Sequence, residues 1–152
     1  MTDYLDTVHR SALMSRVKTR DTKIETTIRS LLHRRGFRFR KNVKLLPGKP
    51  DIVLSKYNAV IFVHGCFWHG HSICTKGKLP ATRVEFWREK ISVNQKNDID
   101  FQSQLLNSGW RVAVVWECAY RNREKRQTST DLLCKWIISD SQYCEITSEG
   151  RV

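Results

Sequence analysis

Residues 47–66 read PGKPDIVLSKYNAVIFVHGC, and this stretch decides the fold. A turn rich in Pro and Gly precedes residues 51–54, which predict one β-strand, and residues 59–63 form a continuous apolar run. A strand without polar alternation is buried on both faces, so we expect the second strand to lie at the centre of a sheet. The short turn over residues 55–58 makes the two strands neighbours.

The flanking sequence carries signals for further helices and strands. Thr22 followed by Glu25 fits a capping box for a helix over residues 21–36, and Thr82 followed by Glu85 fits one for a long helix that ends near residue 108. Further strands are expected at residues 37–41 and 110–116, and a last amphipathic helix at residues 131–138. This order predicts an α/β fold, a three-layer-like sandwich in which helices flank a central mixed sheet.

The length of 152 residues is typical of one domain, so we expect a single domain over residues 1–152. Residues 139–152 are expected to form a peripheral C-terminal tail. No long apolar run is suited to span a membrane, and residues 1–10 lack the apolar core of a secretion signal. We therefore expect a soluble, cytoplasmic protein.

Basic residues outnumber acidic ones along the whole chain. Twenty-seven Lys and Arg side chains against fifteen Asp and Glu give a net charge of +12. Such a surplus attracts polyanions and makes their binding steeply salt-dependent, so nucleic acid is the expected partner. Residues 1–20 are expected to form a basic arm that contacts DNA. On charge alone, a basic protein that needs only solubility, or that binds an acidic protein, stays open.

Five cysteines in a chain without an export signal favour metal ligands over a disulfide framework. Cys66, His71 and Cys74 are separated by four and two positions, and Cys118 is available as the fourth ligand of a tetrahedral zinc ion. Unliganded thiols are the alternative. The two other cysteines have no Cys or His at ligand spacing, and Cys134 fits better as a small core residue on the last helix.

The predicted strand pair also carries residues typical of a nuclease. Asp51 follows Pro50 at the start of one strand and His64 ends the next, so both project from the same end of the pair. Restriction-type nucleases combine a Pro-Asp with an acidic-x-Lys on the neighbouring strand, but here residues 62–64 read Phe-Val-His. On Pro50 and Asp51 alone, an acidic turn residue is the better interpretation. His64 and His69 are further zinc candidates or polar loop residues, although a complete set of four zinc ligands leaves at least one of them for acid–base work.

Five segments resemble one family in consistent order: DTKIE (21–25), LPGKPD (46–51), VHGCFWHGH (63–71), PATRVEFW (80–87) and GWRVAVVWECA (109–119). They are similar to the very-short-patch repair (Vsr) mismatch endonucleases, and the HGCFWH run is highly specific. The chain departs from the family pattern by one additional residue between His71 and Cys74, and by Gly70 where the family has a histidine. Neither change removes a ligand.

The resemblance implies a restriction-endonuclease-like core and an enzyme that nicks duplex DNA 5′ to the T of a T:G mismatch, which arises from deamination of 5-methylcytosine. This nick initiates very short patch repair. Catalytic Mg²⁺ and structural Zn²⁺ are the implied cofactors. The implied protein is a monomer associated with the bacterial nucleoid, with mismatch-repair proteins as further partners.

The resemblance also implies a role for each matching residue. Mg²⁺ is held by Asp51 and by the backbone carbonyl of Val63, and zinc by Cys66, His71, Cys74 and Cys118. The other implied catalytic residues are His69 as general acid or base, His64 at the phosphate, Glu25 acting through metal-bound water, and Asp98 as the carboxylate that orients a histidine. The implied DNA-intercalating residues are Phe67, Trp68 and Trp87.

Each role has a plainer alternative. Glu25 can be a capping-box residue only, Asp98 an exposed helix residue, and the three aromatics core residues. For the protein as a whole, the alternatives are a restriction endonuclease that makes double-strand breaks and a zinc-containing DNA-binding module without catalysis. Linearisation of a plasmid would support the restriction endonuclease, and nicking of a mismatched duplex would support the mismatch endonuclease. Neither activity is expected of the binding module.

Overall fold

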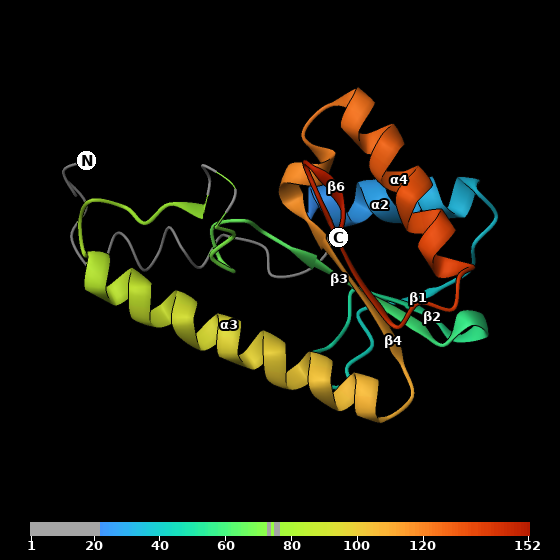
Figure 1. Ribbon diagram of the computed structural model, residues 1–152, viewed down its shortest axis with the longest axis horizontal. Coiled ribbons are helices and arrows are strands. Elements are labelled where there is room, and N and C mark those ends of the chain that lie inside the picture. The colour runs from blue at the N-terminus through green and yellow to red at the C-terminus, as the bar shows by residue number, and fades with distance from the viewer. Residues whose placement is uncertain (1–21, 73, 75–76) are drawn as a thin grey trace.

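The computed structural model describes residues 22–72, 74 and 77–152, so the expected basic arm over residues 1–20 lies outside the described residues. Within them the strands form one six-stranded sheet in the order β1-β2-β3-β4-β5-β6 (Figure 1). The strands are β1 (Arg40–Lys41), β2 (Ile52–Leu54), β3 (Ala59–His64), β4 (Arg111–Trp116), β5 (Tyr143–Thr147) and β6 (Gly150–Arg151). β3 pairs antiparallel with β2 and parallel with β4, and β4 pairs parallel with β5, so the sheet is mixed.

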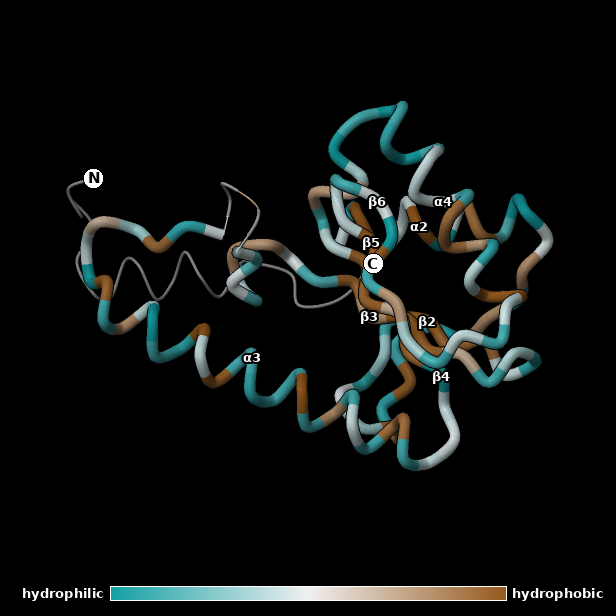
Figure 2. Tube along the Cα trace, viewed as in Figure 1, coloured by the Kyte–Doolittle hydropathy of each residue, from teal (hydrophilic) through white to brown (hydrophobic). Residues whose placement is uncertain are grey.

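The two central strands are buried on both faces. All six residues of β4 and five of the six residues of β3 are buried. Figure 2 shows these strands within the hydrophobic centre of the molecule. This confirms the prediction that the apolar run is a central strand, since water reaches neither face of it.

Helices cover both faces of the sheet, which confirms the predicted three-layer α/β class (Figure 1). α2 (Lys23–Arg34) and α4 (Arg123–Ile137) lie on one face, where Leu32 and Trp136 pack with Ile61 of β3. α3 (Val84–Asn107) lies on the other, where Leu105 packs with Phe62 of β3. Neighbouring residues of β3 face opposite layers because side chains alternate along a strand. The N-terminal half of α3 extends beyond the sheet (Figure 1).

Two of the predicted helix starts are wrong. Thr22 does cap α2, because its hydroxyl accepts a hydrogen bond from the amide of Glu25 at 3.3 Å. By contrast, α3 begins at Val84 and follows Arg83, which is in the left-handed conformation (φ 55°) and makes no side-chain capping bond. Thr82 is therefore one residue too early to cap α3. α4 begins at Arg123 instead of residue 131, since its first two turns are polar and have no apolar period to reveal them.

The C-terminal segment is not peripheral, which corrects the expected tail over residues 139–152. β5 pairs with β4, and its Cys144 and Ile146 side chains are buried in the core beside α4. The link before β5 is fixed by Arg111, whose guanidinium donates to the carbonyls of Trp136 (2.6 Å) and Ser141 (2.9 Å). Short 3₁₀ turns, η1 (Ser55–Tyr57) and η3 (Glu117–Tyr120), follow β2 and β4. None of the described helices combines the length and the apolar character needed to cross a membrane.

Candidate active site and metal centre

A pocket of about 670 Å³ lies where β3 ends, between the N-terminal turn of α2 and the middle of α3. It gathers the residues that the sequence analysis singled out for catalysis from five separate segments. Its lining is Glu25, Asn42, Lys44, Gly48, Lys49, Asp51, Phe62, Val63, His64, His69, Asp98, Phe101 and Gln102.

Asp51 directly precedes β2 and is hydrogen-bonded to the neighbouring strand β3. Its Oδ2 accepts a hydrogen bond from the amide of Val63 at 2.7 Å. The pKa of Asp51 is raised to about 7, mainly by burial; the Val63 amide and Arg29 act to lower this pKa, and the Glu25 carboxylate adds to the rise. Two carboxylates in one desolvated pocket repel each other, and a bound cation relieves that repulsion. This hard oxygen donor set therefore fits a divalent cation such as Mg²⁺.

Glu25 has two separate bonding roles. Its backbone amide bonds to Thr22 at the start of α2, whereas its side-chain Oε2 accepts from the guanidinium of Arg29 at 2.9 Å. The residue is only 4% exposed, and its carboxylate lines the pocket. The side chain is therefore not explained by the capping box alone, because the cap uses the backbone amide.

Two stacked histidines and one carboxylate form the opposite part of the pocket. Asp98 Oδ2 lies 2.5 Å from His69 Nδ1, and Asp98 Oδ1 lies 3.9 Å from His64 Nε2. The two imidazole rings stack with centroids 3.8 Å apart and planes 2° from parallel. Burial lowers the pKa of His64 well below its usual value, and the neighbouring His69 and His71 lower it further, so His64 is neutral near pH 7. Asp98 is not an exposed helix residue, since its side chain is 20% exposed and faces the histidines.

The loop that carries His69 is held against α3 by polar contacts. Asn94 donates to the carbonyl of Trp68 at 2.9 Å, and Gln95 donates to the carbonyl of His69 at 3.2 Å. Gly70 has φ 61°, and a Cβ there would lie 2.5 Å from the Gln95 amide nitrogen. The loop therefore approaches α3 more closely than a larger residue at position 70 would allow without a shift.

The four predicted metal ligands come together in a second, buried cluster. The donor atoms of Cys66, His71, Cys74 and Cys118 all lie within 4.8 Å of one another. His71 Nδ1 is 3.4 Å from the sulfur of Cys66 and 3.5 Å from that of Cys118. A tetrahedral ion with metal–sulfur bonds of about 2.3 Å and a metal–nitrogen bond of about 2.0 Å requires sulfur–nitrogen edges of roughly 3.5 Å. A metal ion therefore fits this cluster.

The remaining donor groups are placed differently. Cys134 and Cys144 lie outside the cluster, on α4 and β5 respectively, and Cys134 packs against the core as the sequence predicted. Donor atoms of His64, His69 and Asp98 also lie within 4.8 Å of one another. The short contact between His69 and Asp98 fits a hydrogen bond better than a metal ion, because His69 Nδ1 and Asp98 Oδ2 are both used in it.

Trp116, which the sequence analysis did not single out, connects the metal cluster with the pocket. Its indole stacks on His71 with centroids 4.0 Å apart, and it meets His64 edge-on at 5.2 Å. Its Nε1 donates to Glu145 at 3.1 Å. No local signal distinguishes this tryptophan from an ordinary apolar strand residue, because its two histidine neighbours are distant in sequence.

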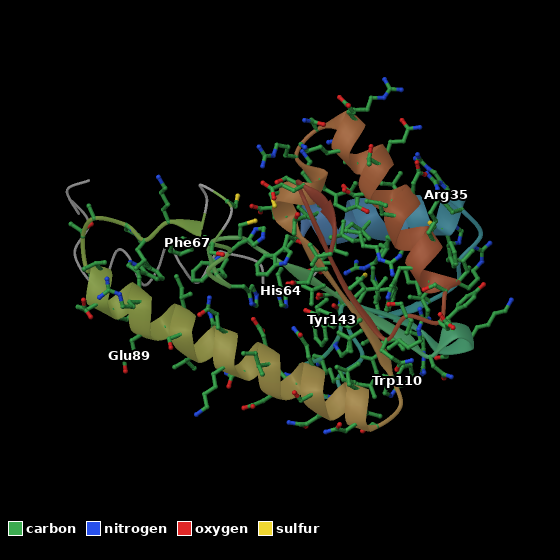
Figure 3. All side chains as sticks on the ribbon, viewed as in Figure 1. Arg35, His64, Phe67, Glu89, Trp110 and Tyr143 are labelled. Atoms are coloured by element: carbon green, nitrogen blue, oxygen red, sulfur yellow. The ribbon has the colours of Figure 1, made fainter. Side chains whose placement is uncertain are left out.

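The three predicted intercalating aromatics form one group beside the metal loop, the segment after β3 that carries Cys66, His71 and Cys74. The ring of Phe67 lies 5.3 Å from those of both Trp68 and Trp87, and the two tryptophan rings are 5.8 Å apart. Figure 3 shows Phe67 beyond His64, toward the N-terminal half of α3. Trp87 is 3% exposed, whereas Phe67 and Trp68 are partly exposed. Trp87 thus supports the other two from α3 in this conformation.

Comparison with known proteins agrees with this arrangement. A family model described as DNA mismatch endonuclease Vsr matches residues 2–76. The chain is 46% identical over 152 residues to the DNA mismatch endonuclease Vsr of Escherichia coli (strain K12). The aligned region covers 99% of this chain and 97% of that protein. The chain belongs to the Vsr family.

Type II nicking enzymes are further relatives of this Vsr chain. It is 49% identical over 123 residues to V.NmeAIP of Neisseria meningitidis serogroup A / serotype 4A (strain DSM 15465 / Z2491), covering 81% of this chain and 87% of that enzyme. It is also 49% identical over 118 residues to V.XorIIP of Xanthomonas oryzae pv. oryzae (strain KACC10331 / KXO85), covering 78% and 86% respectively. Asp98 and Cys118 lie beyond the segment matched by the Vsr family model, but within the nearly full-length alignment with the Escherichia coli protein.

Proposed function

We propose that this protein is a Mg²⁺-dependent DNA mismatch endonuclease that nicks duplex DNA 5′ to the T of a T:G mismatch, and so initiates very short patch repair. One observation carries the proposal. The Asp51 and Glu25 carboxylates share a pocket with the His69–Asp98 pair, in a chain 46% identical to a DNA mismatch endonuclease. A zinc-containing DNA-binding module would have no use for this set of titratable groups.

The Mg²⁺ site is formed by the Asp51 carboxylate and the backbone carbonyl of Val63, with Glu25 beside them. When bound there, Mg²⁺ polarises the scissile phosphate and stabilises the charge that develops on its oxygens. Asp51 is fixed for this task by its bond to the Val63 amide. Arg29 similarly fixes the orientation of Glu25.

His69 is the general acid or base. Its Nδ1 faces Asp98, which leaves Nε2 as the atom that takes or gives a proton. In the overall reaction a water oxygen bonds to phosphorus, the bond from phosphorus to the leaving sugar oxygen breaks, and one proton from the water ends on that oxygen. His64 assists at the phosphate as a neutral imidazole and limits rotation of the stacked His69 ring.

The metal centre is a structural zinc site. Cys66, His71 and Cys74 come from the loop after β3, and Cys118 comes from η3 after β4. One ion therefore ties the loop that carries His69 to the 3₁₀ turn that follows β4, and its binding free energy contributes to folding.

Mismatch recognition depends on stacking. Phe67 and Trp68 directly follow the ligand Cys66, so a zinc-fixed loop presents them as a rigid wedge, with Trp87 as their support on α3. A T:G wobble pair is easier to unstack than a matched pair, so inserting the wedge costs less free energy at the mismatch and binding there is tighter. The basic surface supplies affinity that does not depend on sequence.

The deciding experiment uses end-labelled duplexes that carry T:G, each other mismatch, or a matched T:A pair, with and without Mg²⁺. We expect one nick in the T-containing strand of the T:G duplex, and only with Mg²⁺. Linearisation of an unmodified plasmid would instead support a restriction endonuclease. Binding without any cleavage would support the non-catalytic module.

A further inference from the structure

The loop between β1 and β2 forms one wall of the catalytic pocket. Four of its residues, Asn42, Lys44, Gly48 and Lys49, line the cavity together with Asp51. Among the described residues, the two lysines are the only Lys or Arg residues in that lining, and both are exposed to solvent. Every other charged group there is a carboxylate or a histidine.

The β2–β3 strand pair lacks a lysine at the position where restriction-type active sites carry one. In restriction-type nucleases, the strand opposite the Pro-Asp provides an acidic-x-Lys motif, whereas Phe62, Val63 and His64 occupy those positions here. His64 is buried and its ring stacks on that of His69, so it does not extend into the pocket as a long lysine side chain would. Charge still accumulates on the non-bridging oxygens of a phosphate as it is attacked, so a cation in the pocket has a chemical purpose.

The backbone of Lys49 points to this residue as the replacement. Lys49 has φ 50°, a left-handed conformation that glycine or asparagine adopts at lower cost than lysine. Its amide closes a turn onto the carbonyl of Leu46 at 3.0 Å. The preceding Gly48 is pressed against α3, since a Cβ there would lie 2.8 Å from Phe101. The turn is therefore held in one position at the rim of the pocket, and its geometry alone does not require a lysine.

We propose that Lys49 is the phosphate-binding cation of the cleavage site. The Lys49 ammonium binds a non-bridging oxygen of the scissile phosphate and stabilises the charge that builds there. This inference rests on the proposed nuclease function and adds a residue to it.

Lys49→Gly tests the proposal, because it removes the ammonium and relieves the left-handed backbone at once. We expect its unfolding midpoint to equal or exceed that of the wild type, while its single-turnover nicking of a T:G duplex falls about 100-fold. Lys49→Asn, which also tolerates this backbone, should lose activity to the same degree, and Lys49→Arg should keep most of it. The control is Lys56→Ala in η1, an exposed lysine at the other end of the β2–β3 pair, which should nick at the wild-type rate.

DNA affinity gives a second readout that does not need cleavage. Loss of one phosphate contact should reduce the slope of log affinity against log salt concentration by about one. Lys49→Gly with wild-type nicking, or with an unchanged salt slope, would overturn the proposal and leave Lys49 as a turn residue. A wild-type protein that binds but never nicks would refute the nuclease function instead, and the salt slope would still decide whether Lys49 contacts phosphate.

Discussion

Asp98 and His69 are 29 positions apart in sequence, yet Asp98 Oδ2 lies 2.5 Å from His69 Nδ1 across the space between α3 and the metal loop. The same carboxylate is 3.9 Å from His64, whose ring stacks on that of His69. One helix residue therefore sets the orientation of the proposed acid–base group. This contact explains why a carboxylate, Asp98, lies on the side of α3 that faces the pocket.

Asp98→Asn should lower the nicking rate about 10- to 100-fold with little change in KM, because a neutral amide holds the imidazole less firmly than a carboxylate does. Single-turnover nicking at saturating enzyme measures the effect. The pH profile of the nicking rate is a second readout, because a purely structural role of Asp98 would leave the shape of that profile unchanged. Asp100→Asn, an exposed neighbour on the same helix, is the control. Equal rates for both variants would remove Asp98 from the mechanism.

Asp51→Ala should abolish nicking while leaving DNA binding largely intact. The carboxylate holds the ion needed for the chemistry, whereas affinity comes mainly from the basic surface. His69→Ala should behave similarly, and Glu25→Ala more mildly. Nicking and gel-shift assays on one T:G duplex separate the two effects. Full activity of Asp51→Ala with Mg²⁺ would rule out the proposed catalytic centre.

The raised pKa of Asp51 predicts how stability changes with pH in buffer without Mg²⁺. Its pKa rises from 3.8 to about 7 on folding, so the folded state favours the neutral acid and loses stability as pH rises from about 4 to 7. Asp51→Asn should therefore be more stable than the wild type at pH 8, by up to about 4 kcal/mol, and the advantage should shrink toward pH 5. Denaturant unfolding at several pH values measures this, with exposed Asp140→Asn as control. A variant whose advantage does not depend on pH would contradict the burial of this carboxylate.

Purified protein should contain one zinc ion per chain. Elemental analysis tests this directly, and Cys118→Ser should lower the zinc content and reduce the unfolding midpoint by at least about 10 °C, since ion binding contributes to folding. Cys134→Ser, outside the cluster, should keep its zinc. Two results together would show that the cluster is not a zinc site: the purified protein contains no stoichiometric zinc, and treatment with a chelator leaves its unfolding temperature unchanged.

Trp68→Ala should weaken binding to a T:G duplex about tenfold or more, and binding to a matched T:A duplex much less, because each stack on a base is worth roughly 1–3 kcal/mol. Affinities at one salt concentration give the comparison, and 2-aminopurine beside the mismatch reports unstacking. Trp110→Ala, at the opposite end of α3 (Figure 3), controls for general loss of packing. Equal losses on both duplexes, with no unstacking by the wild type, would make these aromatics core residues.

Several features followed from local sequence alone. The apolar run at residues 59–63 indicated the central strand, because burial on both faces leaves no polar alternation. Thr22 and Glu25 indicated the start of α2, since a capping bond spans only three residues. The spacing of Cys66, His71 and Cys74 indicated a metal cluster for the same reason: three donors within nine residues can converge without help from the rest of the fold.

Other features depended on the tertiary structure. β5 was missed because a short strand is recognisable mainly by the neighbour that buries it, here β4. The local pattern around Arg83 fitted a capping box, yet the chain takes a left-handed turn there instead. The pairing of His69 with Asp98 and the place of Lys49 in the pocket wall join segments separated by many residues. Such contacts form only when helices and loops pack on a common sheet, so no short stretch of this sequence contains them.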